Sequence, residues 1–248
     1  MPDAALLVFA KVPEAGAVKT RLAPPLTLGA AAALYAAFLA DALTAFAAPG
    51  AFGVDVDVRL HLAPSDAPLP AGLVPDGVSV HTQRGHGLGA RMASAIAEAF
   101  AAGYGRAVIT GTDHPTLPLA FVADAFRALA GPPQGPPTVV LGPSDDGGYY
   151  LIGLDRPLPS LFEMTYSHAG VFEATRARAA EAGARTVVLP PGYDVDDGAG
   201  LVRLITEWRA GASVGPKTAA ALARLEESGL GGVSQLHVPS APRPGRTA

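Results

Sequence analysis

The sequence predicts a three-layer α/β/α fold with a mostly parallel sheet. Short runs typical of strands alternate along the chain with longer Ala-rich stretches typical of helices. The first run, residues 4–10 (AALLVFA), is continuously apolar, as expected of a parallel strand covered on both faces. The chain has 248 residues, of which 49% are hydrophobic, so it can bury a sizeable core.

The expected elements follow one another in a regular order. After the first strand, a loop leads to a helix that Thr27 can cap and that runs to about Ala47. Residues 54–62 alternate with period two, which predicts a half-exposed strand. Further strands are expected at residues 78–82, 106–111, 138–142, 149–154 and 185–189, and further helices at 88–102, 119–130, 168–182, 199–210 and 216–227.

No clear break in composition divides the chain into separate domains. We expect one domain over residues 1–210, a helical extension over 211–238 and a disordered tail over 239–248 (PSAPRPGRTA). The extension could pack on the sheet or form a subunit contact, so the oligomeric state stays open.

Charge and composition exclude several classes of protein. A net charge of −4 argues against a nucleic-acid binder with a basic surface. The absence of cysteine excludes disulfides and thiolate metal sites, and it fits the cytoplasm. The longest apolar segment, residues 30–48, is interrupted by Tyr35, Asp41 and Thr44, so no membrane span is expected. We therefore expect a soluble cytoplasmic protein.

Five loops that follow expected strands have unusual sequences. Ligands of open α/β sheets bind at the edge where the parallel strands end, so these loops are candidates for one site. They are KVPEAGAVKTRL (11–22), QRGHGLGARM (83–92), TDHP (112–115), PSDDGG (143–148) and YDVDD (193–197).

The first loop has the composition of a phosphate-binding segment. Lys11, Lys19 and Arg21 supply positive charge, and Gly16 permits a tight turn. Val18 stands directly before the lysine where a P-loop has glycine, and no G-x-G-x-x-G is present. The alternative is a solvated loop with scattered charges.

The second loop leads into a helix. Gly89 lies near the start of that helix and Arg91 falls in its first turns. A helix N-terminus favours an anionic or polar ligand group, although an ordinary Gly-rich turn explains the sequence equally well.

Asp113 is delivered by a buried strand to the sheet edge, where an acid commonly holds Mg²⁺ or Mn²⁺ beside a diphosphate. The alternative is that it supports the turn before Pro115. Asp194 and Asp196 share a side if their segment is extended, whereas Asp197 can cap the next helix.

Convergence of Asp113 and Asp196 would have an electrostatic cost. Two carboxylates about 4 Å apart repel by roughly 4 kcal/mol at an effective dielectric constant near 20. A divalent cation, protonation of one acid or simple separation would offset this repulsion, and the sequence does not choose among them.

Asp145 and Asp146 precede two glycines. Either acid could orient or deprotonate an incoming hydroxyl, and Tyr149 could offer a hydroxyl or ring face to a sugar. The same residues would also form an ordinary turn between two strands.

Taken together, these motifs resemble a known bacterial family. The matching segments are FAKVPEAGAVKTRLAPPL, GLGARM, ITGTDHPTLP, LGPSDDGGYYLIGL and DVDDGAGL, in order over roughly residues 5–205. The chain is similar to small proteins assigned to GT-A-type glycosyltransferases of the nucleotide-diphospho-sugar transferase superfamily. That superfamily also includes guanylyltransferases for phospholactate and for the molybdenum cofactor.

The resemblance implies roles for several residues. Lys19 and Arg21 would grip the nucleotide phosphates, and the GLGARM helix would help to hold the nucleotide. Asp113 would stand in for the second acid of the D-x-D motif, and Asp196 would complete the Mg²⁺ or Mn²⁺ site. Gly111 takes the place of the first acid, so no true D-x-D is present.

We therefore expect a metal-dependent transferase that uses a nucleotide-sugar donor and a small-molecule acceptor. The residues expected to act in catalysis are Lys19, Asp113, Asp145 and Asp146. Two alternatives stay open: a nucleotidyltransferase that releases pyrophosphate, and a non-catalytic nucleotide-binding module.

Overall fold

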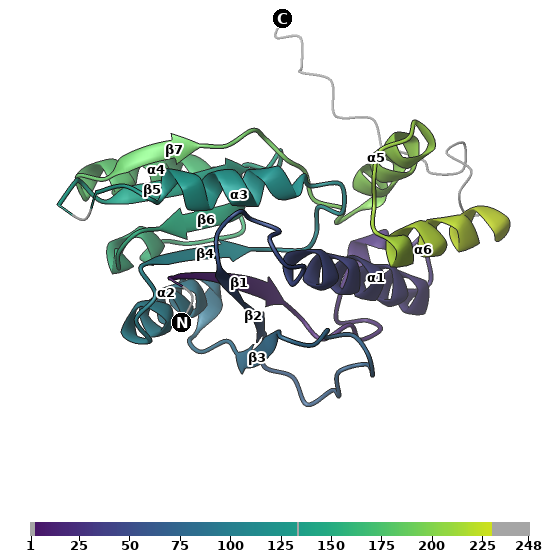
Figure 1. Ribbon diagram of the computed structural model, residues 1–248. Coiled ribbons are helices and arrows are strands. Elements are labelled where there is room, and N and C mark those ends of the chain that lie inside the picture. Colours follow the sequence, from purple (N-terminus) through teal and green to yellow (C-terminus); the bar gives the residue numbers. More distant parts are fainter. Residues whose placement is uncertain (1–2, 133, 230–248) are drawn as a thin grey trace, which may run out of the picture.

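The computed structural model describes residues 3–132 and 134–229 and contains a seven-stranded sheet between helices (Figure 1). The strands lie in the order β3-β2-β1-β4-β6-β5-β7. Their bounds are β1 (Ala4–Ala10), β2 (Val56–Leu62), β3 (Ser79–Thr82), β4 (Arg106–Thr110), β5 (Thr138–Pro143), β6 (Tyr149–Leu154) and β7 (Arg185–Val188). The α-helices are α1 (Leu28–Phe46), α2 (Gly87–Ala101), α3 (Leu119–Ala128), α4 (Val171–Glu181), α5 (Gly198–Arg209) and α6 (Pro216–Glu227). The predicted α/β/α fold class is confirmed.

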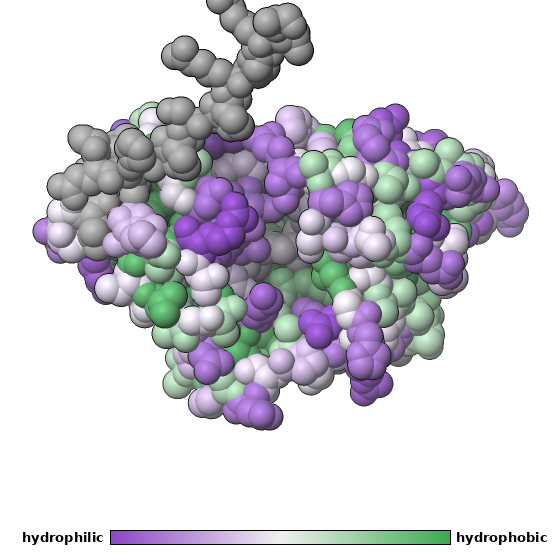
Figure 2. Space-filling view, turned by 180° about the vertical axis from the view of Figure 1, so that it is seen from behind, coloured by the Kyte–Doolittle hydropathy of each residue, from purple (hydrophilic) through white to green (hydrophobic). Residues whose placement is uncertain are grey.

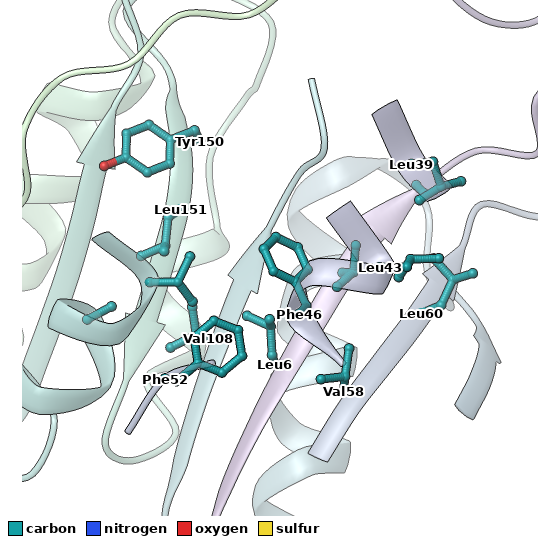
Figure 3. Packing of buried hydrophobic residues seen from close by; sticks show 14 of the residues in the cluster. Leu6, Leu39, Leu43, Phe46, Phe52, Val58, Leu60, Val108, Tyr150 and Leu151 are labelled. Carbon is teal, nitrogen blue, oxygen red and sulfur yellow. The ribbon is translucent and has the colours of Figure 1, made fainter. Parts of the chain in front are cut away.

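Helices cover both faces of the sheet, and β1 lies in its interior beside the central strand, β4. β1 pairs in parallel with β2 and β4, and its side chains alternate between the two helical layers. Leu6 packs in the cluster formed with α1 and α3 (Figure 3), whereas Leu7 packs in the cluster formed with α2. Its continuous apolar sequence is therefore explained by burial on both sides.

One strand departs from the parallel arrangement. β6 runs antiparallel to both of its neighbours, β4 and β5, while the other strands run parallel. A short turn at residues 144–148 joins β5 to β6, and only antiparallel neighbours can be joined so tightly. This turn lies at the edge of the sheet where the parallel strands end.

α1 is the one helix in the described part of the chain that is long and apolar enough to cross a membrane. Half of the 18-residue window that meets this test is buried inside the molecule. Leu39 and Leu43 pack toward the sheet, and Leu34 and Phe38 pack toward the C-terminal helices. Core packing on two sides accounts for its apolar composition.

α5 and α6 lie together beyond one end of the sheet (Figure 1), and α6 packs on α1. Asp41 of α1 accepts hydrogen bonds from the backbone N–H groups of Lys217 (3.1 Å) and Thr218 (2.7 Å), which caps α6. The expected extension thus contains a helix docked on the main body. Its last residues and the expected tail, 230–248, lie outside the described residues, and the three-part division stays a proposal.

Candidate functional site

The loops after β1 and β4 and the segment before α5 meet at one point. Lys19 Nζ lies 2.5 Å from Asp113 Oδ1 and 2.6 Å from Asp196 Oδ1. The Lys19 side chain is 5% exposed, so the ammonium is enclosed, whereas the two carboxylates are partly exposed. The structure therefore brings these three predicted site residues together.

The local backbone directs Lys19 into this position. Its φ of 49° lies in the left-handed region, which is unfavourable for a residue with a side chain by about 1–2 kcal/mol. The preceding Val18 is buried against Ala32 and Tyr35 of α1, and this anchors the loop. A strained conformation held by a buried neighbour is typical of functional positions.

Burial and charge act on Lys19 in opposite directions. Burial alone would lower its pKa, but Asp113 and Asp196 raise the pKa above its ordinary value of 10.5. Lys19 therefore carries its charge at neutral pH, and the ammonium offsets the repulsion between the two carboxylates.

Asp194 is a further acid of this cluster to which the sequence analysis assigned no role. Burial, together with the nearby charges of Asp113, Asp196 and Asp146, raises its pKa to about 7. Ser144 Oγ donates a hydrogen bond to Asp194 Oδ2 at 3.3 Å. The alternation of Asp194 and Asp196 around the buried Val195 was the signal in the sequence that could have identified it.

A cavity of about 220 Å³ lies beside these acids. Asp113 and Asp194 line it, together with the apolar or aromatic side chains of Phe9, Met92 and Tyr149. Figure 2 shows the molecule from behind, where a hollow near the middle of the face is bordered by both hydrophilic and hydrophobic residues. A lining of both acidic and apolar side chains suits a ligand with a charged and an uncharged part.

The remaining residues of the first loop lie farther from the acids or on the surface. Arg21 is exposed and pairs with Asp197 at 2.9 Å, so it borders the cluster. Lys11 contributes a backbone hydrogen bond to Tyr35 at 3.0 Å, and its side chain is exposed. Gly16 has a φ of 87°, which explains the need for glycine at that turn.

The start of α2 is used for packing. A Cβ atom on Gly89 would lie 2.5 Å from the carbonyl oxygen of Phe162 and 2.6 Å from a ring carbon of Tyr166. Arg91 donates from Nε to the carbonyl oxygen of Gly85 at 3.3 Å. Close contact between α2 and the segment near residue 162 therefore explains Gly89, and a role in nucleotide binding stays a prediction.

Asp145 and Asp146 form the turn between β5 and β6, as the structural alternative predicted. Asp146 Oδ1 accepts a hydrogen bond from the backbone N–H of Gly148 at 2.9 Å. Asp145 pairs with Arg203 of α5 at 2.7 Å. Asp145 is thus paired, whereas the charge of Asp146 lies near enough to act on Asp194 of the cluster. Asp197 caps α5, the alternative considered for it, by accepting from two backbone N–H groups.

The acids fit a divalent cation only in part. Among the described residues, no group of three or more His, Asp or Glu side chains could hold a metal ion. Asp113 and Asp196 nevertheless converge and stay 38% and 47% exposed. Because Mg²⁺ is often held by one or two carboxylates plus substrate phosphates, this pair suits an ion that arrives with a diphosphate.

Comparisons with known proteins agree with this architecture. A family model described as an uncharacterized protein conserved in bacteria (DUF2064) matches residues 47–168. A crystal structure from Desulfovibrio desulfuricans G20, of a protein provisionally named a nucleotide-diphospho-sugar transferase, has a TM-score of 0.81 and 32% identity, covering 92% of this chain and 96% of that chain. No curated protein matches the sequence.

More distant structures show weaker similarity. CMP:2-keto-3-deoxy-manno-octonic acid synthetase, complexed with CTP, has a TM-score of 0.50 and 14% identity, covering 84% of this chain and 98% of that chain. A manganese complex of Rv0371c from Mycobacterium tuberculosis H37Rv has a TM-score of 0.49 and 19% identity, covering 81% and 96%. The expected nucleotide-diphospho-sugar transferase fold is thereby confirmed.

Proposed function

The chain belongs to the DUF2064 family of bacterial proteins, and we propose that it is a metal-dependent transferase that uses a nucleotide-sugar donor. The observation that carries the proposal is the enclosed Lys19 ammonium between Asp113 and Asp196, at the sheet edge beside a cavity. Its support is the fold shared with a protein named for nucleotide-diphospho-sugar transfer at 32% identity.

The charge balance of the cluster supports a cation requirement. Two carboxylates, Asp113 and Asp196, contact one ammonium, and Asp194, with a pKa of about 7, and Asp146 lie near enough to add to the negative charge. An anionic diphosphate would meet net negative charge at this point. A divalent cation held by Asp113 and Asp196 would, when bound, neutralise the diphosphate and favour its departure. We therefore include Mg²⁺ or Mn²⁺ in the proposal.

In the proposed reaction, Lys19 and Arg21 hold the donor phosphates. An acceptor oxygen forms a bond to the anomeric carbon of the sugar, and the bond from that carbon to the diphosphate oxygen breaks. The nucleoside diphosphate leaves with the electron pair, and the hydroxyl proton passes to Asp146, since Asp145 is paired with Arg203. Tyr149 offers its ring face to the sugar in the cavity.

The absence of cysteine agrees with a cytoplasmic location, which belongs to the same proposal.

A thermal-shift panel of nucleotides, with and without Mn²⁺, tests this function. We expect a nucleoside diphosphate to raise the melting temperature only when Mn²⁺ is present, and a nucleotide-sugar to release its sugar slowly. Stabilisation by a triphosphate, with pyrophosphate release when an acceptor phosphate is added, would instead favour nucleotidyl transfer. Binding without turnover would favour a non-catalytic module.

Substitution of Asp113 provides the matched test of the residue assignment. Asp113→Asn should abolish the Mn²⁺-dependent shift and lower the rate by about 10²–10³-fold, because it removes a charge that acts on the diphosphate site. Asp145→Asn, at the exposed pair with Arg203, should retain the shift. An unchanged Mn²⁺ response in Asp113→Asn would show that another acid holds the cation.

A further inference from the structure

A second cavity lies against the loop that carries Asp113. Its volume is about 590 Å³, and it is enclosed by α1, α3 and the segment that precedes α6. Gly111, His114 and Leu117 line both this cavity and the smaller acid-lined one, so the two adjoin at the loop after β4. A cavity of this size is in the range that accommodates a small molecule.

The walls of the second cavity are apolar and carry no positive charge. Phe38, Phe46 and Val122 are among the side chains that form them, and no Lys or Arg is among the described residues that line the space. Its one acid, Asp41, is occupied by the N-terminus of α6 through two hydrogen bonds. A phosphate or carboxylate would therefore find no cation there, which makes its burial costly.

Two hydroxyl side chains on these walls, Thr112 and Thr218, have a buried Oγ1 atom without a hydrogen-bond partner among the described residues. Thr218 is 0% exposed, and its Oγ1 has no hydrogen-bond partner in the described part of the chain. His114 also lines the cavity, but its buried Nδ1 atom faces the backbone of Gly192, where a Cβ atom would lie 2.6 Å from it. A buried polar atom without a partner costs about 1–3 kcal/mol, so such atoms in a cavity point to a ligand that supplies the missing hydrogen bond.

We infer that this cavity binds the acceptor of the proposed transfer, and that the acceptor is an uncharged molecule with a hydroxyl group on a largely apolar framework. The inference rests on the proposed function and specifies its substrate class. Thr218 supplies a hydrogen bond to the acceptor, and the apolar walls enclose its framework. His114 lies at the junction of the two cavities and directly follows Asp113, so a hydroxyl beside its ring is next to the donor site. An acceptor phosphate, which nucleotidyl transfer needs, is disfavoured by the same walls.

Ligand-observed fluorine NMR on the full-length protein tests the cavity with two probes, 4-fluorobenzyl alcohol and the anion 4-fluorobenzoate. We expect the wild type to bind the alcohol and not the anion. Ala45→Phe fills the cavity from α1 and should weaken alcohol binding at least tenfold. Ala33→Phe is the matched control, because it places the same side chain from the same helix into the separate groove between α1 and α6. Equal binding of both probes, no binding of the alcohol, or unchanged binding in Ala45→Phe would overturn the inference.

Thr218→Val separates a binding role from a structural one. Because the hydroxyl has no partner in the described part of the chain, its removal should leave the unfolding midpoint unchanged or raise it, while alcohol binding weakens several-fold. A lower midpoint with unchanged alcohol binding would contradict the assignment. The response to nucleoside diphosphate with Mn²⁺ should persist in both cavity variants. If the wild type itself shows no response to nucleoside diphosphate with Mn²⁺, the proposed function is wrong. The NMR result would still decide whether the cavity binds the alcohol.

Discussion

At the scale of single residues, the positive charge of Lys19 stabilises the two neighbouring carboxylates of the candidate site. The repulsion expected between Asp113 and Asp196 is offset within the protein by one ammonium, at 2.5 and 2.6 Å. The same ammonium occupies one oxygen of each carboxylate, so it competes with any cation that approaches the pair. The left-handed backbone of Lys19 shows that the fold accepts local strain to place this charge.

Lys19→Met should expose this competition. Loss of the ammonium leaves the charges of two carboxylates uncompensated. We therefore expect the free energy of unfolding at pH 7 to fall by about 1–3 kcal/mol, which lies between the contributions typical of exposed and of buried ion pairs. Added Mn²⁺ should recover part of this loss and stabilise the variant more than the wild type. Urea unfolding with and without Mn²⁺ measures both effects. A Mn²⁺ response equal to that of the wild type would show that the ammonium and the cation do not share a site.

A stack of three rings predicts how stability depends on pH. His61 is 1% exposed and lies between Phe9 (5.6 Å) and His81 (5.0 Å) on adjacent strands. Burial, together with the neighbouring charges of His81 and Arg59, lowers the pKa of His61 from 6.5 to about 3. Between these two values the unfolded chain binds a proton that the folded chain does not, so stability is complete above pH 6.5 and falls as the pH falls.

His61→Phe keeps a ring in the stack and removes the titrating group. Between pH 7 and pH 5, His61 should account for roughly 2 kcal/mol of lost stability in the wild type, at 1.36 kcal/mol per pH unit. His114, with a pKa lowered by burial to about 4, contributes to both proteins alike. Unfolding at the two pH values should therefore give a smaller loss for the variant; an equal loss would show that His61 is not held neutral.

At the scale of elements, glycines mark where the helices approach other segments. A Cβ on Gly215, just before α6, would lie 2.2–2.4 Å from atoms of the Asp41 side chain that caps this helix. The contact between α1 and α6 therefore depends on the absence of a side chain at this position. Since α6 also contributes Thr218 to the second cavity, the same contact fixes one wall of that cavity.

Gly215→Ala should weaken the attachment of α6. We expect a loss of about 1–3 kcal/mol in the free energy of unfolding, because the added methyl group displaces the Asp41 carboxylate from the helix N-terminus. Gly198→Ala, where no atom lies within 4 Å of the new Cβ, is the control and should be close to neutral. Urea denaturation compares the two; similar effects would mean that the Asp41 cap tolerates the methyl group.

At the scale of the whole molecule, the order of the strands creates the site. β1 and β4 are neighbours although about one hundred residues separate them, so the loop with Lys19 and the loop with Asp113 lie side by side. β5 runs in the same direction as β4, because the antiparallel β6 lies between them. The turn with Asp146, which joins β5 to β6, therefore lies at the same edge. The loop after β4 then separates two adjoining cavities, one bordered by acids and one apolar.

The sequence by itself determined the fold class, the order of the elements and the loops that form the site. Hydrophobic periodicity, helix caps and glycine-rich turns are local properties, and each expected strand and helix among the described residues is present, with ends shifted by a few residues. The prediction that loops with Lys19, Asp113 and Asp196 meet followed from the rule that parallel strands end at one edge.

Only the tertiary structure decided which charges pair and which residues pack. Three such features depend on segments that are distant in sequence. Lys19 offsets the charges of the acids, Arg203 pairs with Asp145, and a neighbouring carbonyl group leaves room only for glycine at position 89. The membership of Asp194 in the acid cluster and the apolar second cavity have the same origin. These features arise from distances in space, and local sequence patterns do not encode such distances.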